Sequence, residues 1–230
     1  MFNITRLVHL IDPADRMAAE VVRKRITANA ESTPARRVLV EPTLAGVRNG
    51  GDIVVHLQFD SAAQWNANRA VIDAALSDEA IRHIDGVNYE RSENVSYRGR
   101  RSTPQPARVY RTLLFRVDDN APAAEKTRFE NATLQMPVHM PAMSAWSLSH
   151  VQQAIGTSRW THVWEQEFTD IDALLGQYMH HPVHWALVDR WFDPECPDHI
   201  VTDRVCHTFC AMSEPVIDTR PSAPAPRPAT

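Results

Sequence analysis

The feature that most constrains this chain is the order of its secondary-structure signals, which runs twice as strand, helix, strand, strand, helix, strand. In the first pass, β-branched runs, amphipathic stretches and turn residues predict these elements over Ile4–Ile11, Asp15–Ala30, Arg37–Val47, Ile53–Asp60, Ser61 to about His83, and Gly86–Tyr97. In the second pass the same signals predict them over Arg108–Val117, Ala123–Met136, Ala145–Ile155, Trp160–Phe168, Ile171–Trp191 and His199–Ala211. A βαββαβ unit packs two helices on one face of an antiparallel sheet and leaves the other face bare. The sequence therefore predicts an α+β fold of two fused ferredoxin-like halves whose bare sheet faces pack together within one chain.

Two segments of unusual composition divide this pattern. The segment RGRRSTPQP at Arg98–Pro106 is basic, polar and contains proline, as is typical of a linker. The C-terminal PSAPAPRPAT is rich in proline and alanine and has almost no apolar bulk, which predicts disorder. We therefore predict a first half over residues 1–98, a linker over 99–106, a second half over 107–214 and a disordered tail over 215–230.

Composition narrows the possible partners and compartments. Lys and Arg number 24 against 28 Asp and Glu, which argues against a broad nucleic-acid-binding surface. No apolar run approaches the roughly 18 residues that span a bilayer, and the N-terminus lacks the pattern of a secretory signal. The 3 cysteines form neither a disulfide framework nor a zinc motif. These features predict a cytoplasmic protein with a small-molecule substrate, no nucleic-acid or membrane partner, and a possible homodimer formed through sheet edges.

Histidines and aromatic residues are concentrated in the second half. The densest stretches are THVWEQEF at 161–168 and YMHHPVH at 178–184. Because side chains alternate along a strand, His162 and Trp164 share one face, and that face can meet the helices. Glu165 and Glu167 lie on the opposite face. The strand therefore presents an imidazole and an indole towards the helix that follows it.

A proline interrupts that helix. Pro182 lacks an N–H and clashes with the carbonyl of Tyr178, so the helix is predicted to end near His180 and to restart at Pro182. The break gathers Tyr178, His181 and His184 at a helix junction that faces the strand. A continuous helical wheel would place these three side chains wrongly.

The segment THVWEQEF-x-D-x-x-A-L-x-x-Y-x-x-HP-x-H resembles the stress-responsive dimeric α/β-barrel (Dabb) family, over roughly Arg108–Met212. The resemblance implies an intramolecular version of the dimeric barrel, with a degenerate first half. In plant polyketide (olivetolic acid) cyclase-type members, the catalytic tyrosine and histidine match Tyr178 and His184, and a strand histidine matches His162. Their first-strand histidine falls on Arg111, where this chain departs from the pattern.

Imidazole and phenol groups are sufficient for enolate chemistry without a cofactor. A histidine can remove a proton next to a carbonyl, and a tyrosine hydroxyl can donate to the oxygen that becomes negative. We therefore predict a cofactor-independent acid–base enzyme, a cyclase, lyase or isomerase, acting on a small apolar carbonyl or phenolic compound. The predicted catalytic residues are Tyr178, His184 and His162, and the predicted substrate-binding residues are Arg111, Trp164, His181 and Trp185.

Several alternatives remain open from the sequence alone. The chain can instead be a non-catalytic stress-responsive or hydrophobic-ligand-binding barrel. His181 can cap the second helix, and the other polar residues can be buried structural groups. Binding of a metal by His180, His181 and His184, or of haem, is a further alternative, although no metal ligand or cofactor is predicted.

Overall fold

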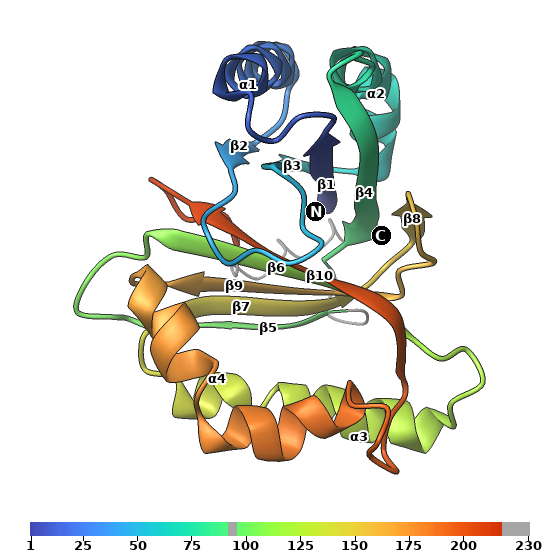
Figure 1. Ribbon diagram of the computed structural model, residues 1–230, viewed down its shortest axis with the longest axis vertical. Helices are drawn as coiled ribbons and strands as arrows, with labels where there is room; N and C mark the ends of the chain where they lie inside the picture. Colours follow the sequence, from blue (N-terminus) through green and yellow to red (C-terminus); the bar gives the residue numbers. More distant parts are fainter. Residues whose placement is uncertain (92–95, 218–230) are drawn as a thin grey trace, which may run out of the picture.

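The computed structural model describes residues 1–91 and 96–217, which form two antiparallel sheets with helices on their outer faces (Figure 1). The strands are β1 Phe2–Leu10, β2 Arg37–Pro42, β3 Ile53–Phe59, β4 Ile81–Glu90, β5 Ser96–Arg100, β6 Val109–Val117, β7 Met143–His150, β8 Gln153–Ile155, β9 His162–Phe168 and β10 Val201–Ala211. The α-helices are α1 Arg16–Glu31, α2 Ala62–Leu76, α3 Ala123–Thr133 and α4 Met136–His139. Two π-helices, η1 Ala173–Tyr178 and η2 His184–Val188, precede the 3-10 helix η3 Asp189–Trp191. The first sheet has the strand order β2-β3-β1-β4-β8, and the second has β10-β6-β9-β7-β5.

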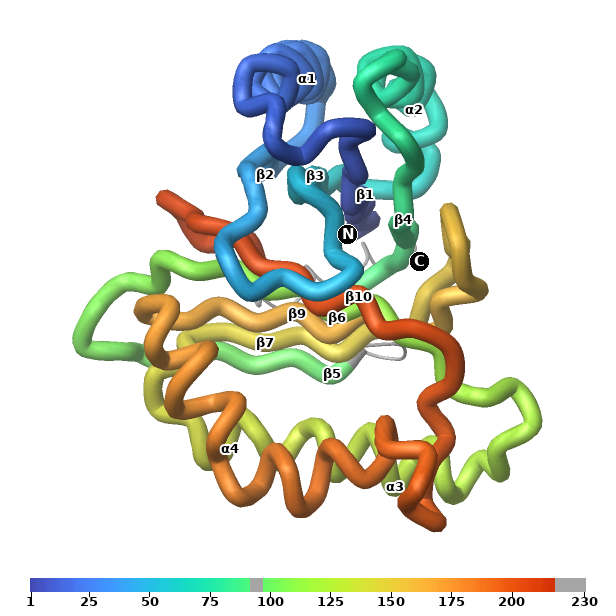
Figure 2. Tube along the Cα trace, in the orientation of Figure 1, coloured from blue at the N-terminus to red at the C-terminus, as the bar shows by residue number. Residues whose placement is uncertain are grey.

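Helices α1 and α2 cover the outer face of the first sheet, and the later helices cover the outer face of the second (Figures 1 and 2). Side chains of Asp15 and Ser61 accept hydrogen bonds from backbone N–H groups in the first turns of α1 and α2, as N-caps do. Val22 and Ile26 of α1 and Ile72 of α2 are fully buried against that sheet. The α+β fold of two fused ferredoxin-like halves is confirmed. No helix in the described ranges has the length and apolar character needed to cross a bilayer.

The two halves exchange edge strands, which the sequence did not predict. Strand β5 follows the first half but pairs with β7 in the second sheet, and β8 comes from the second half but pairs with β4 in the first. The predicted boundary between residues 98 and 99 therefore falls inside β5. The predicted strand Ala145–Ile155 is likewise two strands in different sheets. Both differences arise because the edges of β7 and β4 would otherwise expose unpaired N–H and C=O groups.

The second helix of the first half is shorter than predicted. It ends at Leu76, where the Ser77 hydroxyl donates to the carbonyl of Asp73, and β4 begins at Ile81. The prediction of a helix continuing to about His83 was therefore wrong. Pairing of Ile81 with Leu10 in β1 supplies sheet hydrogen bonds that outweigh the local helical pattern.

The predicted tail begins with ordered residues. Val216 and Ile217 are buried, and their backbone N–H groups each donate to the Glu167 carboxylate over 2.6 Å. The prediction of disorder was therefore wrong for Val216 and Ile217, because a buried carboxylate holds this segment. The rest of the predicted tail, residues 218–230, lies outside the described residues.

A buried ion pair occupies the space between the two sheets. Arg91, at the end of the first half, donates to both carboxylate oxygens of Glu165 on β9, over 3.2 and 2.5 Å. Both side chains are fully buried, and the Tyr110 hydroxyl donates to the same carboxylate over 2.8 Å. Burial alone would raise the pKa of Glu165, but Arg91 and neighbouring groups lower it, so the carboxylate stays charged. The ion pair therefore joins the two halves at a position where neither side chain is exposed to solvent.

We expect Arg91→Met to lower the free energy of unfolding by about 3–5 kcal/mol, because it leaves Glu165 charged and unpaired in the interior. Urea titration followed by circular dichroism measures the change. The double variant Arg91→Met/Glu165→Leu should recover most of the loss. Arg36→Met, which removes an exposed ion pair with Asp60, serves as the control and should cost no more than about 1 kcal/mol. A loss below that limit in Arg91→Met would contradict the role of the pair.

Candidate active site

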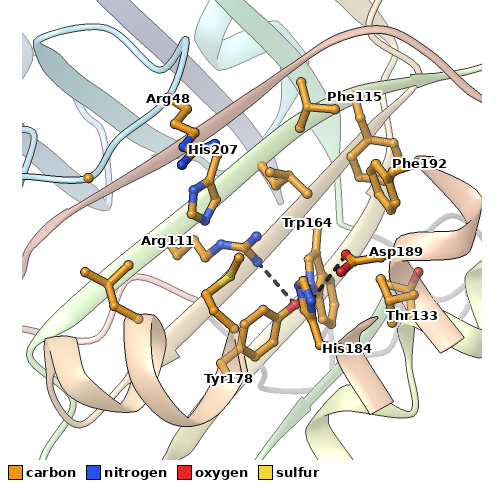
Figure 3. Close-up of a pocket in the computed structure, with 16 residues that line it drawn as sticks. Arg48, Arg111, Phe115, Thr133, Trp164, Tyr178, His184, Asp189, Phe192 and His207 are labelled. Carbon is orange, nitrogen blue, oxygen red and sulfur yellow. Dashed lines mark hydrogen bonds and ion pairs between the residues drawn. The ribbon is translucent and has the colours of Figure 1, made fainter. Parts of the chain in front are cut away.

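A cavity of about 500 Å³ lies between the outer face of the second sheet and the helices that follow β9 (Figure 3). Strands β6, β9 and β10 form its floor with Arg111, Leu113, Phe115, Trp164, Val205 and His207. Helix α3 contributes Thr133, and the helical segment after β9 contributes Leu175, Tyr178, Met179, His184, Val188, Asp189 and Phe192. Gly46 and Arg48, in the loop between β2 and β3 of the first half, complete the lining. The cavity is thus mostly apolar, with a few polar groups directed into it, as is typical of a small-molecule site.

The Tyr178 hydroxyl lies at the centre of these polar groups (Figure 3). Arg111 Nη1 donates to it over 3.3 Å, and Trp164 Nε1 lies 3.4 Å away and also donates. A phenol oxygen that accepts two hydrogen bonds still carries its own proton. Tyr178 is almost fully buried at the cavity wall, so this proton can be donated to a bound molecule.

Arg111 is a buried cation without a carboxylate partner in the described part of the chain. Its guanidinium contacts the amide oxygen of Gln166 and stacks 5.0 Å from the centroid of the Tyr178 ring. Its Nε has no hydrogen-bond partner among the described residues, and burial lowers the pKa of the group below its ordinary value. A buried charge is costly unless it is paired. An anionic oxygen in the cavity would supply the missing partner.

His184 opens η2 and places its imidazole beside Tyr178. The two ring centroids are 4.9 Å apart, with the rings close to edge-on. Asp189 Oδ1 lies 3.2 Å from His184 Nδ1, at ion-pair distance. The nearby carboxylate stabilises the protonated imidazole that would form when His184 removes a proton.

His207 is a pocket residue that the sequence analysis missed. Its Nε2 is buried and has no hydrogen-bond partner among the described residues. Burial, and then the charges of Arg111, His184 and Arg48, lower its pKa to about 2, so the ring is neutral. The sequence did contain a signal for His207, because Val205, His207 and Phe209 occupy alternate positions of a predicted strand and therefore share one face. The backbone pairing of His207 with Arg48, which brings the first half to the pocket, has no such signal.

The structure separates His162 from the other predicted catalytic residues. Its ring stacks on Phe115 with centroids 5.3 Å apart, and its Nε2 lies 3.4 Å from Glu130 Oε1 on α3. It shares a strand face with Trp164, as predicted, but it lies two residues before Trp164, at the first residue of β9. Phe115 lines the pocket whereas His162 does not. Sequence alternation gives the face of a strand but not how far along that face a cavity extends.

The break at Pro182 is confirmed, but it does not gather all the predicted side chains. Helix η1 ends at Tyr178, and helical structure resumes at Pro182. His181 Nδ1 accepts a hydrogen bond from the Val183 N–H over 3.2 Å, so it caps the second helix outside the pocket lining. Trp185 follows His184 on the helix, about 100° further round it, and is 60% exposed. These two residues were predicted to bind substrate, and neither lines the cavity.

Comparisons with known proteins agree with this architecture. Residues 109–206 match the family model described as Stress responsive A/B Barrel Domain (Dabb). Among solved structures, an anthrone oxidase-like protein aligns with a TM-score of 0.63 and 10% identity, over 93% of this chain and 91% of the other. A mutant chlorite dismutase from Candidatus Nitrospira defluvii in complex with cyanide gives a TM-score of 0.54 and 10% identity, over 93% and 90%. A putative monooxygenase from Lactobacillus acidophilus NCFM gives 0.51 and 10%, over 94% and 98%. At these identities the alignments establish the fold alone, and a search of curated protein sequences found no match.

The neutral His207 predicts a particular pH dependence of stability. Below pH 6.5 the unfolded chain protonates this histidine, whereas the folded chain keeps it neutral down to about pH 2. The free energy of unfolding should therefore fall as the pH falls below 6.5, with this group contributing up to about 1.4 kcal/mol per pH unit. In His207→Gln this contribution should vanish, which urea titrations between pH 4.5 and 7 can measure. Replacement of the exposed His180 by Gln should keep the wild-type slope, and an unchanged slope in His207→Gln would refute the assignment.

Proposed function

Residues 109–206 match the Stress responsive A/B Barrel Domain, and we propose that the cavity of this half removes a proton from the carbon next to the carbonyl of a small, apolar ketone or phenolic compound. The reaction needs only acid–base groups of the protein. The enolate that forms can close a ring by aldol addition, can revert an aldol by cleavage, or can be reprotonated elsewhere as an isomerisation. The proposed enzyme is therefore a cyclase, lyase or isomerase that uses no cofactor.

One observation carries the proposal, namely the pairing of Arg111 with the Tyr178 hydroxyl at the cavity wall. A buried guanidinium that has no carboxylate partner within residues 1–91 and 96–217 favours an oxygen that becomes negative during the reaction. Tyr178 accepts from Arg111 and Trp164 and therefore directs its own proton at that oxygen. Donors fixed in this way stabilise the enolate more than the neutral carbonyl, and that difference is what lowers a reaction barrier.

His184 is the proposed base. Its ring lies beside Tyr178, so a substrate whose oxygen contacts Tyr178 places an adjacent carbon near the imidazole. Asp189 stabilises the charge that His184 acquires on protonation. Apolar residues of the lining, Leu113, Phe115, Val188 and Phe192, would hold the rest of the substrate and exclude water. We assign no substrate contact to His162, His181 or Trp185, because they do not line the cavity.

The same apolar lining also supports a second function, a barrel that holds a hydrophobic ligand without converting it. In addition, solved proteins of this fold carry the names anthrone oxidase-like protein and putative monooxygenase. An enolate formed at His184 can pass electrons to dioxygen, so an oxidative outcome would share the first deprotonation. The experiment below measures that deprotonation directly and does not depend on the final product.

We expect the full chain to accelerate hydrogen–deuterium exchange at the benzylic carbon next to the carbonyl of 2-tetralone in D2O, followed by proton NMR. His184→Ala should slow the exchange by about 100-fold or more, because the base is lost. Tyr178→Phe should slow it by about 100-fold, because the enolate loses a donor. His180→Gln, an exposed histidine outside the cavity lining, is the matched control and should exchange at the wild-type rate.

The measurement also separates the two functions. Binding of 2-tetralone by calorimetry without any exchange above the buffer rate would favour the ligand-holding barrel over the enzyme. Exchange that persists unchanged in both His184→Ala and Tyr178→Phe would end the assignment of these residues. Oxygen consumption in the same samples would identify the oxidative branch.

A further inference from the structure

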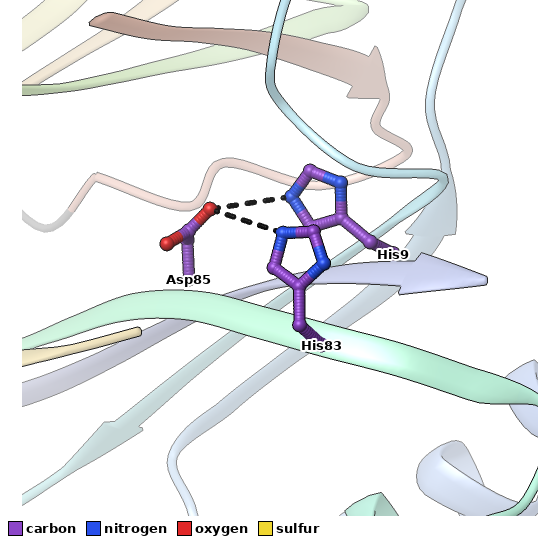
Figure 4. Close-up of side chains that lie close together, drawn as sticks. All are labelled: His9, His83 and Asp85. Carbon is purple, nitrogen blue, oxygen red and sulfur yellow. Dashed lines mark ion pairs between the residues drawn. The ribbon is translucent and has the colours of Figure 1, made fainter. Parts of the chain in front are cut away.

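A cluster of two histidines and an aspartate lies in the first half, away from the cavity (Figure 4). His9 on β1 pairs directly with His83 on β4, and Asp85 follows two residues later on the same strand face. His9 and Asp85 are buried, and His83 is partly exposed. The mistaken helix over the region of His83 hid this juxtaposition from the sequence analysis.

The ligand atoms of the three side chains all lie within 4.8 Å of one another, and the two imidazole rings stack with their centroids 3.9 Å apart. Nε2 of His9 lies 3.4 Å from Asp85 Oδ2, and Nε2 of His83 lies 3.6 Å from the same oxygen. Both Nε2 atoms are buried without a hydrogen-bond partner among the described residues, although they point towards one carboxylate. Ligands about 2.0–2.1 Å from a tetrahedral Zn²⁺ lie about 3.3 Å from one another, close to the separations seen here.

We propose that His9, His83 and Asp85 bind a divalent transition-metal ion of the Zn²⁺ type, with water at the partly exposed His83 side. Two imidazoles and a carboxylate are donors that such ions prefer.

The second half of the chain holds the carboxylate in place. The backbone N–H of Thr157 donates to Asp85 Oδ1 over 2.7 Å, and its hydroxyl donates over 2.8 Å. These bonds orient Asp85 and leave Oδ2 directed at the two imidazoles, as second-shell contacts do in metal sites. A bound ion would therefore connect strands of the first half to the turn after β8.

Arg204 on β10 contacts the same Oδ2 and is the internal competitor for this position. Its side chain is 34% exposed, so it can move into solvent when a divalent ion binds. Competition predicts that removal of the guanidinium tightens metal binding. A purely structural carboxylate–arginine pair predicts no such gain.

A second cluster in the chain provides the control. Glu130, His150 and His162 also lie close together, but His150 Nε2 and Glu130 Oε1 already form a hydrogen bond of 2.7 Å. His150 is half exposed, and its replacement leaves the cluster at His9 untouched. The two clusters thus have the same ligand types but differ in whether the imidazole nitrogens are already partnered.

The test is a titration of the untagged, chelator-treated full chain with Co²⁺, followed by visible absorption and by competition with Zn²⁺. We expect one Co²⁺ per chain with the intense absorption of a tetrahedral site, displaced by Zn²⁺. His83→Gln should weaken binding at least tenfold, and His150→Gln should bind as the wild type does. Circular dichroism of each variant shows whether it is folded, and His83 is suitable because it lies at the partly exposed side.

Arg204→Gln should bind Co²⁺ several-fold more tightly than the wild type. An affinity that does not rise in this variant would remove Asp85 as a ligand and overturn the three-residue site. The proposal also fails if the wild type binds no Co²⁺, or if His83→Gln binds it unchanged while His150→Gln does not.

Discussion

Each sheet of this protein has helices on one face only, and the other face has to be kept from water. The two uncovered faces pack against one another and bury an apolar cluster between them. This cluster includes Leu7 and Val87 from the first sheet and Leu114 and Val163 from the second. The exchange of β5 and β8 closes the edges of this arrangement. That packing brings the first-half loop with Arg48 over the second-half cavity, where backbone hydrogen bonds between Arg48 and His207 hold it to β10.

Strand β9 shows how one short segment serves two purposes. Glu165 points between the sheets, where it pairs with Arg91 and fixes the halves together. Trp164 points the opposite way, into the cavity, where its indole N–H holds the Tyr178 oxygen. Because side chains alternate, assembly and chemistry are separated to opposite faces of the strand. A shift of one residue in its pairing would exchange them and lose both.

Both functional inferences begin from buried polar groups that the fold leaves incompletely paired. Arg111 faces the cavity without a carboxylate partner among the described residues. The Nε2 atoms of His9 and His83 face one carboxylate oxygen and have no hydrogen-bond partner in the same part of the chain. Folding has to offset the cost of such groups, because buried polar atoms are otherwise paired. An anionic oxygen in the first case and a metal ion in the second would supply the partner. The two sites lie in different halves, so the experiment on one proposal does not decide the other.

The sequence by itself determined the order of elements, the duplicated fold, the break at Pro182 and the approach of Tyr178 to His184, since all of these follow from local periodicity and the chemistry of proline. It also identified Trp164 through strand alternation, and the resemblance to the family pointed to Arg111. The tertiary structure alone decided the rest. It placed His162 behind Phe115, turned Trp185 to the surface, brought His207 and Arg48 to the cavity, and paired His9 with His83. These outcomes depend on contacts between distant segments, whose free energies outweigh local preferences and leave no periodic trace in the sequence.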